Sequence, residues 1–155
     1  MPDVMSTAER SALMAKVKGK NTTPEMLVRK ALFAAGFRFR LHRKDLPGCP
    51  DIVLPRHKVV VFVHGCFWHA HRGCPRSKLP GTRQEFWRDK QTRNAARDAA
   101  TVQSLHDQGW RVLVVWECAL RRKHGIEGIS AAFSNWLDSG HQHGEIDRNT
   151  SHLAS

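Results

Sequence analysis

Three of the four cysteines occur in a spacing that limits how this chain can fold. Cys66 and Cys74 enclose two histidines in a segment without hydrophobic periodicity, and Cys118 follows a later apolar run. Tetrahedral zinc is often held by three thiolates and one imidazole, and this set would be Cys66, His71, Cys74 and Cys118. Such a site would fix an irregular loop to the ends of two strands. The alternative is a group of buried thiols without metal, beside exposed histidines.

The apolar runs predict a small sheet. Strict alternation over Phe37–Leu41 predicts a half-buried strand. Two β-rich runs, Asp51–Leu54 and Val59–Val63, are separated by Pro55–Lys58 as in a hairpin. Trp110–Trp116 is almost entirely apolar, which predicts a strand buried on both faces.

Capping residues, proline and glycine mark the ends of the predicted helices. Thr23 is the expected N-cap of one helix, which Gly36 ends. Thr82, in a capping box with Glu85, starts a long helix that runs to about Gln108. The remaining segments are an N-terminal helical arm over residues 1–20, a last helix over 126–137 and a polar tail, 139–155, that we expect to be mobile.

No repeat or linker divides the 155 residues, so we expect one domain over 1–155. The order of the elements predicts an α/β fold with a mixed central sheet flanked by helices. The chain carries 25 Lys and Arg against 14 Asp and Glu, a net charge of +11, which favours a polyanionic partner such as nucleic acid or an anionic membrane surface. The apolar runs are too short to span a membrane, and we expect an intracellular protein.

Asp51 starts one strand of the predicted hairpin, and His64 ends the other. The start of one hairpin strand lies beside the end of the next, so these two residues should be close together, with His69 nearby in the following loop. A carboxylate there is a plausible magnesium ligand, because Mg²⁺ takes one or two carboxylates and otherwise water and phosphate oxygens. The alternative is a solvated carboxylate at the end of a turn.

The long helix carries polar residues on the stripe that should face the protein. Lys90, Asn94 and Asp98 share a face with Trp87, and Leu105 continues the stripe. Two interpretations are equally supported: an apolar stripe that ends in a solvated half, or a polar face near Asp51 with Lys90 or Asn94 close to a phosphate.

Two Phe-Trp pairs, Phe67-Trp68 and Phe86-Trp87, lie among arginines and lysines. Large apolar side chains on a basic surface can wedge between base steps and kink a duplex. Each of these rings could instead be a core residue.

Together these motifs resemble the very short patch repair (Vsr) endonucleases. The resemblance covers roughly residues 5–138 and rests on the HGCFWH hexapeptide that starts at His64, the FWxxK element that starts at Phe86 and the WEC element that starts at Trp116. It implies a restriction-endonuclease-like α/β core and a nick 5′ to the T of a T:G mismatch in double-stranded DNA. It also implies a bacterial, cytoplasmic, nucleoid-associated monomer, with a mismatch-repair protein as a further partner.

The resemblance also implies roles for single residues. Asp51 and the main-chain carbonyl of Val63 would bind catalytic magnesium. His69 would be the general base or the group that positions water, and His64 a second catalytic histidine; which of the two is the base stays open. Glu25 and Asp98 would hold hydrated metal from outside, although the first-turn position of Glu25 is also explained by the helix dipole. The zinc ligands would be the four residues named above, and the aromatic wedge would be Phe67, Trp68 and Trp87.

The sequence departs from the wider fold group at the second catalytic strand. Val61-Phe62-Val63 stands where an acidic-x-Lys pair is usual, which moves the role of the base to histidine. Some relatives carry a hydroxyl residue in place of Val63, and the choice of metal ligand between His69 and His71 stays open. Two alternatives to this function stay open. One is a zinc-stabilised DNA-binding module without catalysis, and the other is a nuclease of the same fold with a different mismatch or sequence preference.

Overall fold

A computed structural model describes residues 22–120 and 125–148 of the protein; for residues 125–127 it describes the backbone only. The predicted arm over 1–20 therefore lies outside the described residues. The helices, strands and short 3₁₀ turns are, in chain order, α2 (Thr23–Ala34), β1 (Arg40–Leu41), β2 (Ile52–Leu54), η1 (Pro55–His57), β3 (Val59–His64), η2 (Pro75–Ser77), α3 (Gln84–Asp107), β4 (Arg111–Trp116), α4 (Glu117–Leu120), α5 (Gly125–Ser139) and β5 (His143–Ile146).

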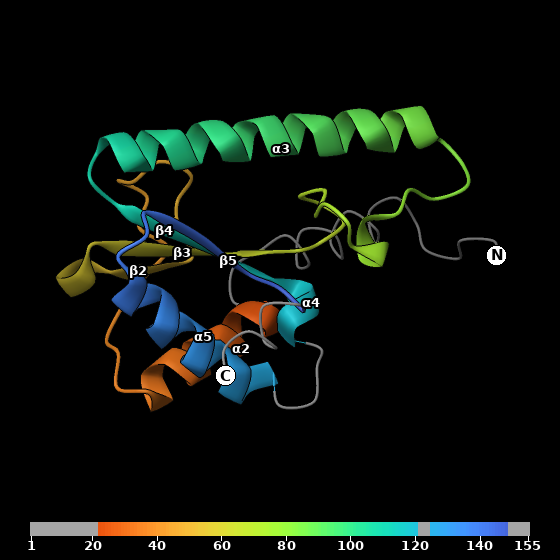
Figure 1. Cartoon of the computed structure of the whole chain (residues 1–155). Coiled ribbons are helices and arrows are strands. Elements are labelled where there is room, and N and C mark those ends of the chain that lie inside the picture. The colour runs from red at the N-terminus through yellow and green to blue at the C-terminus, as the bar shows by residue number, and fades with distance from the viewer. Residues whose placement is uncertain (1–21, 121–124, 149–155) are drawn as a thin grey trace, which may run out of the picture.

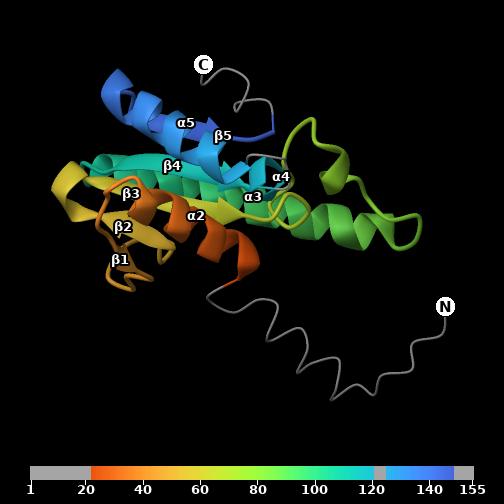
Figure 2. The ribbon, with the colours of Figure 1, turned by 90° about the horizontal axis from the view of Figure 1, so that it is seen from below.

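The five strands form one mixed sheet in the order β1-β2-β3-β4-β5. The first three strands are antiparallel neighbours, whereas β3, β4 and β5 run parallel. The helix α3 lies across one face of the sheet, and α2 and α5 pack together on the other (Figures 1 and 2). The predicted α/β class, the hairpin and the central strand are confirmed.

A hydrophobic core fills each face of the sheet because the β-branched residues of β3 alternate between the two sides. Val61 faces α2 and α5 together with Leu113 and Phe133. Val60 faces α3 together with Leu105. In β4 every residue from Val112 to Trp116 is buried.

The predicted helix starts need correction. Thr22, not Thr23, caps α2, and its hydroxyl accepts a hydrogen bond from the backbone N–H of Glu25. The capping box at Thr82 does not form, because α3 starts after Arg83, whose backbone is left-handed and whose side chain makes no capping bond. The strand predicted over Phe37–Leu41 shortens to its last two residues, because β1 is an edge strand that pairs only with β2.

The prediction of a mobile tail from Ser139 is wrong for His143–Ile146, which forms β5. The strand β5 pairs with one edge of the buried strand β4, and without β5 the backbone groups along that edge would have no hydrogen-bonding partner. Ile146 enters the core with 1% exposure. A polar sequence with one apolar anchor does not show the periodicity from which a strand is predicted. Residues 149–155 lie outside the described part of the chain.

Candidate functional site

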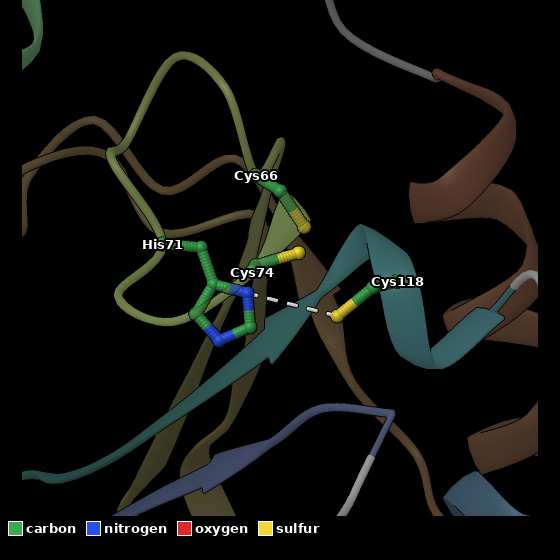
Figure 3. A group of neighbouring side chains, drawn as sticks. All are labelled: Cys66, His71, Cys74 and Cys118. Atoms are coloured by element: carbon green, nitrogen blue, oxygen red, sulfur yellow. Dashed lines mark hydrogen bonds between the residues drawn. The ribbon is translucent and has the colours of Figure 1, made fainter. Parts of the chain in front are cut away.

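The cysteine and histidine cluster forms where β3 and β4 end. In the parallel register His64 pairs with Trp116, so Cys66 and Cys118 each follow two residues later and meet beyond the sheet. The ligand atoms of the predicted set all lie within 4.8 Å of one another, and the set comprises Cys66, His71, Cys74 and Cys118 (Figure 3). The Nδ1 of His71 lies 3.6 Å from the Sγ of Cys118. The structure thus brings the four residues together, and their donor set suits a closed tetrahedral metal site.

Burial controls the protonation of these thiols. It raises the pKa of Cys66 to about 12 and also raises the pKa of Cys118. Without a metal both thiols hold their protons at neutral pH, and a bound cation would displace them.

A second cluster lies at the end of β3, under α3. The rings of His64 and His69 are stacked, with centroids 3.8 Å apart. The Nδ1 of His69 lies 2.6 Å from the Oδ2 of Asp98, which projects from α3. Burial, followed by the neighbouring His69, lowers the pKa of His64 to about 3, so this imidazole is neutral in the physiological range.

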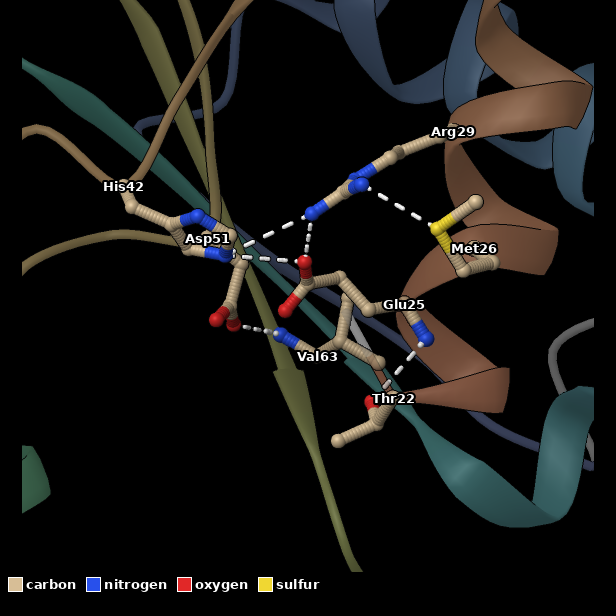
Figure 4. Close-up of polar contacts among 7 residues, drawn as sticks. All are labelled: Thr22, Glu25, Met26, Arg29, His42, Asp51 and Val63. Atoms are coloured by element: carbon tan, nitrogen blue, oxygen red, sulfur yellow. Dashed lines mark hydrogen bonds and ion pairs between the residues drawn. The ribbon is translucent and has the colours of Figure 1, made fainter. Parts of the chain in front are cut away.

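A third cluster surrounds Asp51 at the start of β2 (Figure 4). Its Oδ2 accepts a hydrogen bond of 2.8 Å from the backbone N–H of Val63. Burial is the main cause that raises the pKa of Asp51 to about 7, and the carboxylate of Glu25 raises it further, while the Val63 hydrogen bond and His69 lower it. Ligand atoms of Asp51, Glu25 and His42 lie within 4.8 Å of one another.

Glu25 is only 3% exposed, and its carboxylate is anchored from two sides. Arg29, one helical turn later, forms an ion pair with its Oε2, and the Nε2 of His42 lies 2.8 Å from the same oxygen. Sequence reasoning missed both partners. The i,i+4 spacing of Glu25 and Arg29 is a usable signal, whereas His42 comes close only through the fold.

The predicted meeting of Asp51, His64 and His69 takes the form of two adjoining clusters. The backbone of Val63 and His64 joins them, because Val63 binds the Asp51 carboxylate and His64 begins the imidazole stack. The charge of His69 acts on the pKa of Asp51, so the two clusters also interact electrostatically. Asp98 belongs to the imidazole cluster and Glu25 to the carboxylate cluster.

Four aromatic rings gather at the first turn of α3. Phe67 packs edge-on against Trp68 and Trp87, with centroids 5.3 and 5.6 Å away. Phe86 is 39% exposed, and the cationic groups of Arg83 and Lys90 lie 4.3 and 5.6 Å from its centroid. The rings therefore form one partly exposed cluster with a basic surround.

The polar face of α3 holds the loop that carries Phe67 and Trp68. The amide of Asn94 donates to the carbonyl of Trp68 at 2.8 Å, and that of Gln91 donates to the carbonyl of Phe67 at 2.8 Å. Asn94 thus holds the loop, and its place near a phosphate stays a prediction. Sequence reasoning missed Gln91, although it lies on the same helical stripe as Asn94 and this spacing could have found it. The inward orientation of the stripe is confirmed, since Asn94 and Asp98 are half-buried.

A cavity of about 430 Å³ lies between α3 and the sheet, and it connects the imidazole cluster with Glu145 on β5. The Oε1 of Glu145 accepts a 2.7 Å hydrogen bond from the indole of Trp116. Hydrogen bonding from His143 is the main cause that lowers the pKa of Glu145 to about 2. Glu145 escaped prediction because it lies in the segment expected to be mobile.

Over the part of the chain that the structure describes, none of the helices has the length and apolar character needed to cross a membrane.

Comparison with known proteins gives consistent matches. Residues 2–76 match the family model described as DNA mismatch endonuclease Vsr. The chain is 49% identical over 138 residues to the type II nicking enzyme V.XorIIP of Xanthomonas oryzae pv. oryzae, covering 89% of this chain and 98% of that protein. It is 46% identical over 123 residues to the type II nicking enzyme V.NmeAIP of Neisseria meningitidis, covering 79% and 87%. It is 38% identical over 155 residues to the DNA mismatch endonuclease Vsr of Escherichia coli, covering 99% of each.

Proposed function

Given that this chain belongs to the Vsr family of DNA mismatch endonucleases, we propose that it nicks double-stranded DNA on the 5′ side of the T in a T:G mismatch. The mixed α/β sheet is the restriction-endonuclease-like fold of the family. Because the family consists of endonucleases, it argues against the alternative of a zinc-stabilised DNA-binding module without catalysis. The observation that carries the proposal is the adjoining carboxylate and imidazole clusters at the end of β3.

We assign magnesium to the carboxylate cluster. Asp51 and the carbonyl of Val63 would hold the ion, and Glu25 and Asp98 would hold its water ligands from outside. The donor set fits a hard cation, because burial, and after it the carboxylate of Glu25, raises the pKa of Asp51 to about 7, and a divalent cation would offset both effects. When bound, magnesium lowers the pKa of a water ligand and neutralises charge on the leaving oxygen.

His69 is the general base in this proposal. Its Nδ1 donates to the Asp98 carboxylate at 2.6 Å, which leaves Nε2 to accept a proton from water. The charge gained by His69 would be stabilised by Asp98. His64, with its pKa near 3, stays neutral beneath the ring, so the stack brings no like-charge repulsion.

The cysteine and histidine cluster would hold structural zinc. Its four ligands are all buried, which leaves no open position for catalysis. Zinc would instead fix the loop between β3 and α3, which carries His69, Phe67 and Trp68.

The aromatic cluster would recognise the mismatch. Phe67, Trp68 and Trp87 form the proposed wedge, and Lys90 or Asn94 would contact a phosphate beside it. A mispaired step is unstacked at lower cost than a paired one, so a wedge favours the mismatch. The net charge of +11 supports binding to phosphates in general. We assign Asn94 to hold the loop of the wedge.

The cellular setting belongs to the same proposal. Related nicking enzymes occur in bacteria, and DNA as substrate supports a cytoplasmic, nucleoid-associated protein. Action as a monomer and contact with a mismatch-repair protein follow from the family resemblance alone.

The test is a cleavage map on 5′- and 3′-labelled duplexes that carry each mismatch in varied contexts, with Mg²⁺ and with EDTA, after retention of zinc is checked. The proposal expects a single-strand cut 5′ to T in T:G duplexes, and no cut with EDTA. Equal cleavage of matched duplexes, or preference for another mismatch, would favour the nuclease of altered specificity. Cleavage at an unchanged rate with EDTA would contradict the assignment of magnesium.

A further inference from the structure

The last described residues of the chain, Glu145–Arg148, pass beside the cysteine and histidine cluster. They begin within β5, and Ile146 anchors them in the core with 1% exposure. We refer to these four residues as the C-terminal clasp. Three separate contacts connect the C-terminal clasp with the cluster.

The first contact is between Asp147 and His71. The Oδ2 of Asp147 lies 3.5 Å from the Nε2 of His71, while the Nδ1 of the same ring lies 3.6 Å from the Sγ of Cys118. Figure 3 shows Nε2 directed away from the thiols. A ring in this orientation can ligate a metal only through Nδ1, so Nε2 carries the proton and faces a carboxylate. Carboxylates placed in this way fix the tautomer and orientation of metal-binding histidines.

Arg148 makes the second contact, with the loop and with a thiol. Its Nη2 donates to the carbonyl of Gly73 at 3.3 Å, next to the ligand Cys74. Its backbone N–H donates to the sulfur of Cys118, another proposed ligand. Arg148 therefore contacts the cluster both through the loop and through Cys118.

The third contact runs through Trp116. Glu145 accepts a 2.7 Å hydrogen bond from its indole N–H. The six-degree angle and 4.0 Å centroid separation show that this ring is stacked on His71. Glu145 therefore supports the orientation of His71 indirectly, through the Trp116 ring.

We propose that the C-terminal clasp is the outer shell of the zinc site, so that zinc binding and docking of residues 145–148 stabilise each other. Asp147 is the positioning residue in this arrangement, acting through His71. The proposal rests on the zinc ligation proposed above. A thermodynamic coupling is reciprocal, so it has to appear both in zinc affinity and in protection of the clasp.

The first measurement is zinc affinity, by competition with a chromogenic chelator on the full chain. Asp147→Ala should weaken zinc binding about 10- to 100-fold, as loss of an outer-shell partner does elsewhere, and Asp147→Asn should fall between. The matched control is Asp138→Asn, an exposed aspartate of α5, which should leave the affinity unchanged. If Asp147→Ala binds zinc as tightly as the unchanged chain, the proposal is overturned. Absence of zinc from the unchanged chain would instead overturn the zinc site itself.

The second measurement is amide hydrogen exchange of the unchanged chain with zinc and after its removal, which avoids any folding defect of a variant. Peptides that contain residues 145–148 should exchange faster after zinc removal, whereas peptides from α2 should change little. Equal protection of the clasp in the two states would overturn the proposal, even if Asp147 affected zinc affinity.

Discussion

Asp51 is costly to keep ionised in the folded chain. Burial and the nearby Glu25 raise its pKa from 3.8 to about 7. A carboxyl group whose pKa is higher in the folded state favours folding when it is protonated, and that contribution is lost as the pH rises through the folded pKa. This loss of stability is what a cation at the site would offset.

We therefore predict that Asp51→Asn stabilises the protein in magnesium-free buffer at alkaline pH. The gain in melting temperature over the unchanged chain should be small near pH 4, should grow as the pH rises toward 7 and should level off above 7. Thermal unfolding across this range, with zinc retained, measures the gain. A variant less stable than the unchanged chain at pH 8 would show that the ionised carboxylate is already compensated by other groups.

In the proposed mechanism Asp98 acts through His69, because its carboxylate accepts a hydrogen bond from the Nδ1 of that ring. Asp98→Asn keeps the size of the side chain but can donate to Nδ1, which would turn the wrong tautomer toward water. We predict a fall in the single-turnover nicking rate of about 10²-fold or more, with binding of the DNA unchanged. Asp89→Asn, on the exposed side of the same helix, is the control. An unchanged rate for Asp98→Asn would remove His69 as the base.

At this scale the sequence predicted residue types better than their partners. The His64 and His69 side chains belong to one short motif, so their proximity could be anticipated. His42 and Asp147 could not, because each reaches its cluster only after a distant segment has folded.

The strand pair β3 and β4 and the helix α3 position the cysteine and histidine cluster and the proposed aromatic wedge. The parallel pair β3 and β4 places Cys66 and Cys118 at equivalent points beyond the sheet. The helix α3 holds the intervening loop through Gln91 and Asn94. The ends of β3 and β4 and the polar face of α3 thus fix the loop between β3 and α3, which has little regular structure of its own.

Cys118→Ala tests the metal cluster. We predict that it loses bound zinc and lowers the melting temperature by several degrees, because loop and strand ends are no longer joined. Cys49→Ser, at a half-buried cysteine outside the cluster, should keep both zinc and stability. Metal analysis and thermal unfolding give the comparison, and retention of one equivalent of zinc by Cys118→Ala would contradict the assigned ligands.

Trp68→Ala tests the aromatic wedge. Loss of a stacking ring should weaken binding to a T:G duplex by about 1–3 kcal/mol, and binding to a matched duplex much less. Phe33→Ala, an exposed aromatic on α2 with 56% exposure, controls for a general loss of apolar surface. Equal losses on both duplexes, measured at one salt concentration, would assign Trp68 to the core.

The elements differ in how far their sequences reveal them. Val59–Val63 and Trp110–Trp116 are apolar enough to be predicted as strands, and both are confirmed. The strand β5 has one buried apolar residue, Ile146, and its pairing with β4 comes from the tertiary structure. The strand β1 is shorter than the alternating pattern over Phe37–Leu41 predicts. It lies at the edge of the sheet and pairs only with β2, and a sequence pattern does not reveal how many neighbouring strands a segment will have.

At the scale of the whole molecule, two adjoining clusters at the end of β3 act as one catalytic centre in this account. One supplies carboxylates and the other supplies imidazoles, and the backbone of Val63 and His64 joins them. The α/β class and the gathering of these residue types could be predicted from the sequence. Their division into two clusters could not, because it depends on the side of the sheet to which each side chain turns.

The most direct test is the single-turnover nicking rate of Asp51→Ala and of His69→Ala on a T:G duplex at saturating Mg²⁺. Zinc content, folding and DNA binding are measured on the same preparations, with His57→Ala, whose ring packs on Phe37, as the matched control. The account predicts that each variant nicks at least about 10²-fold more slowly while zinc, fold and DNA binding are retained. Nicking by either variant at the rate of the unchanged chain would contradict a shared catalytic centre.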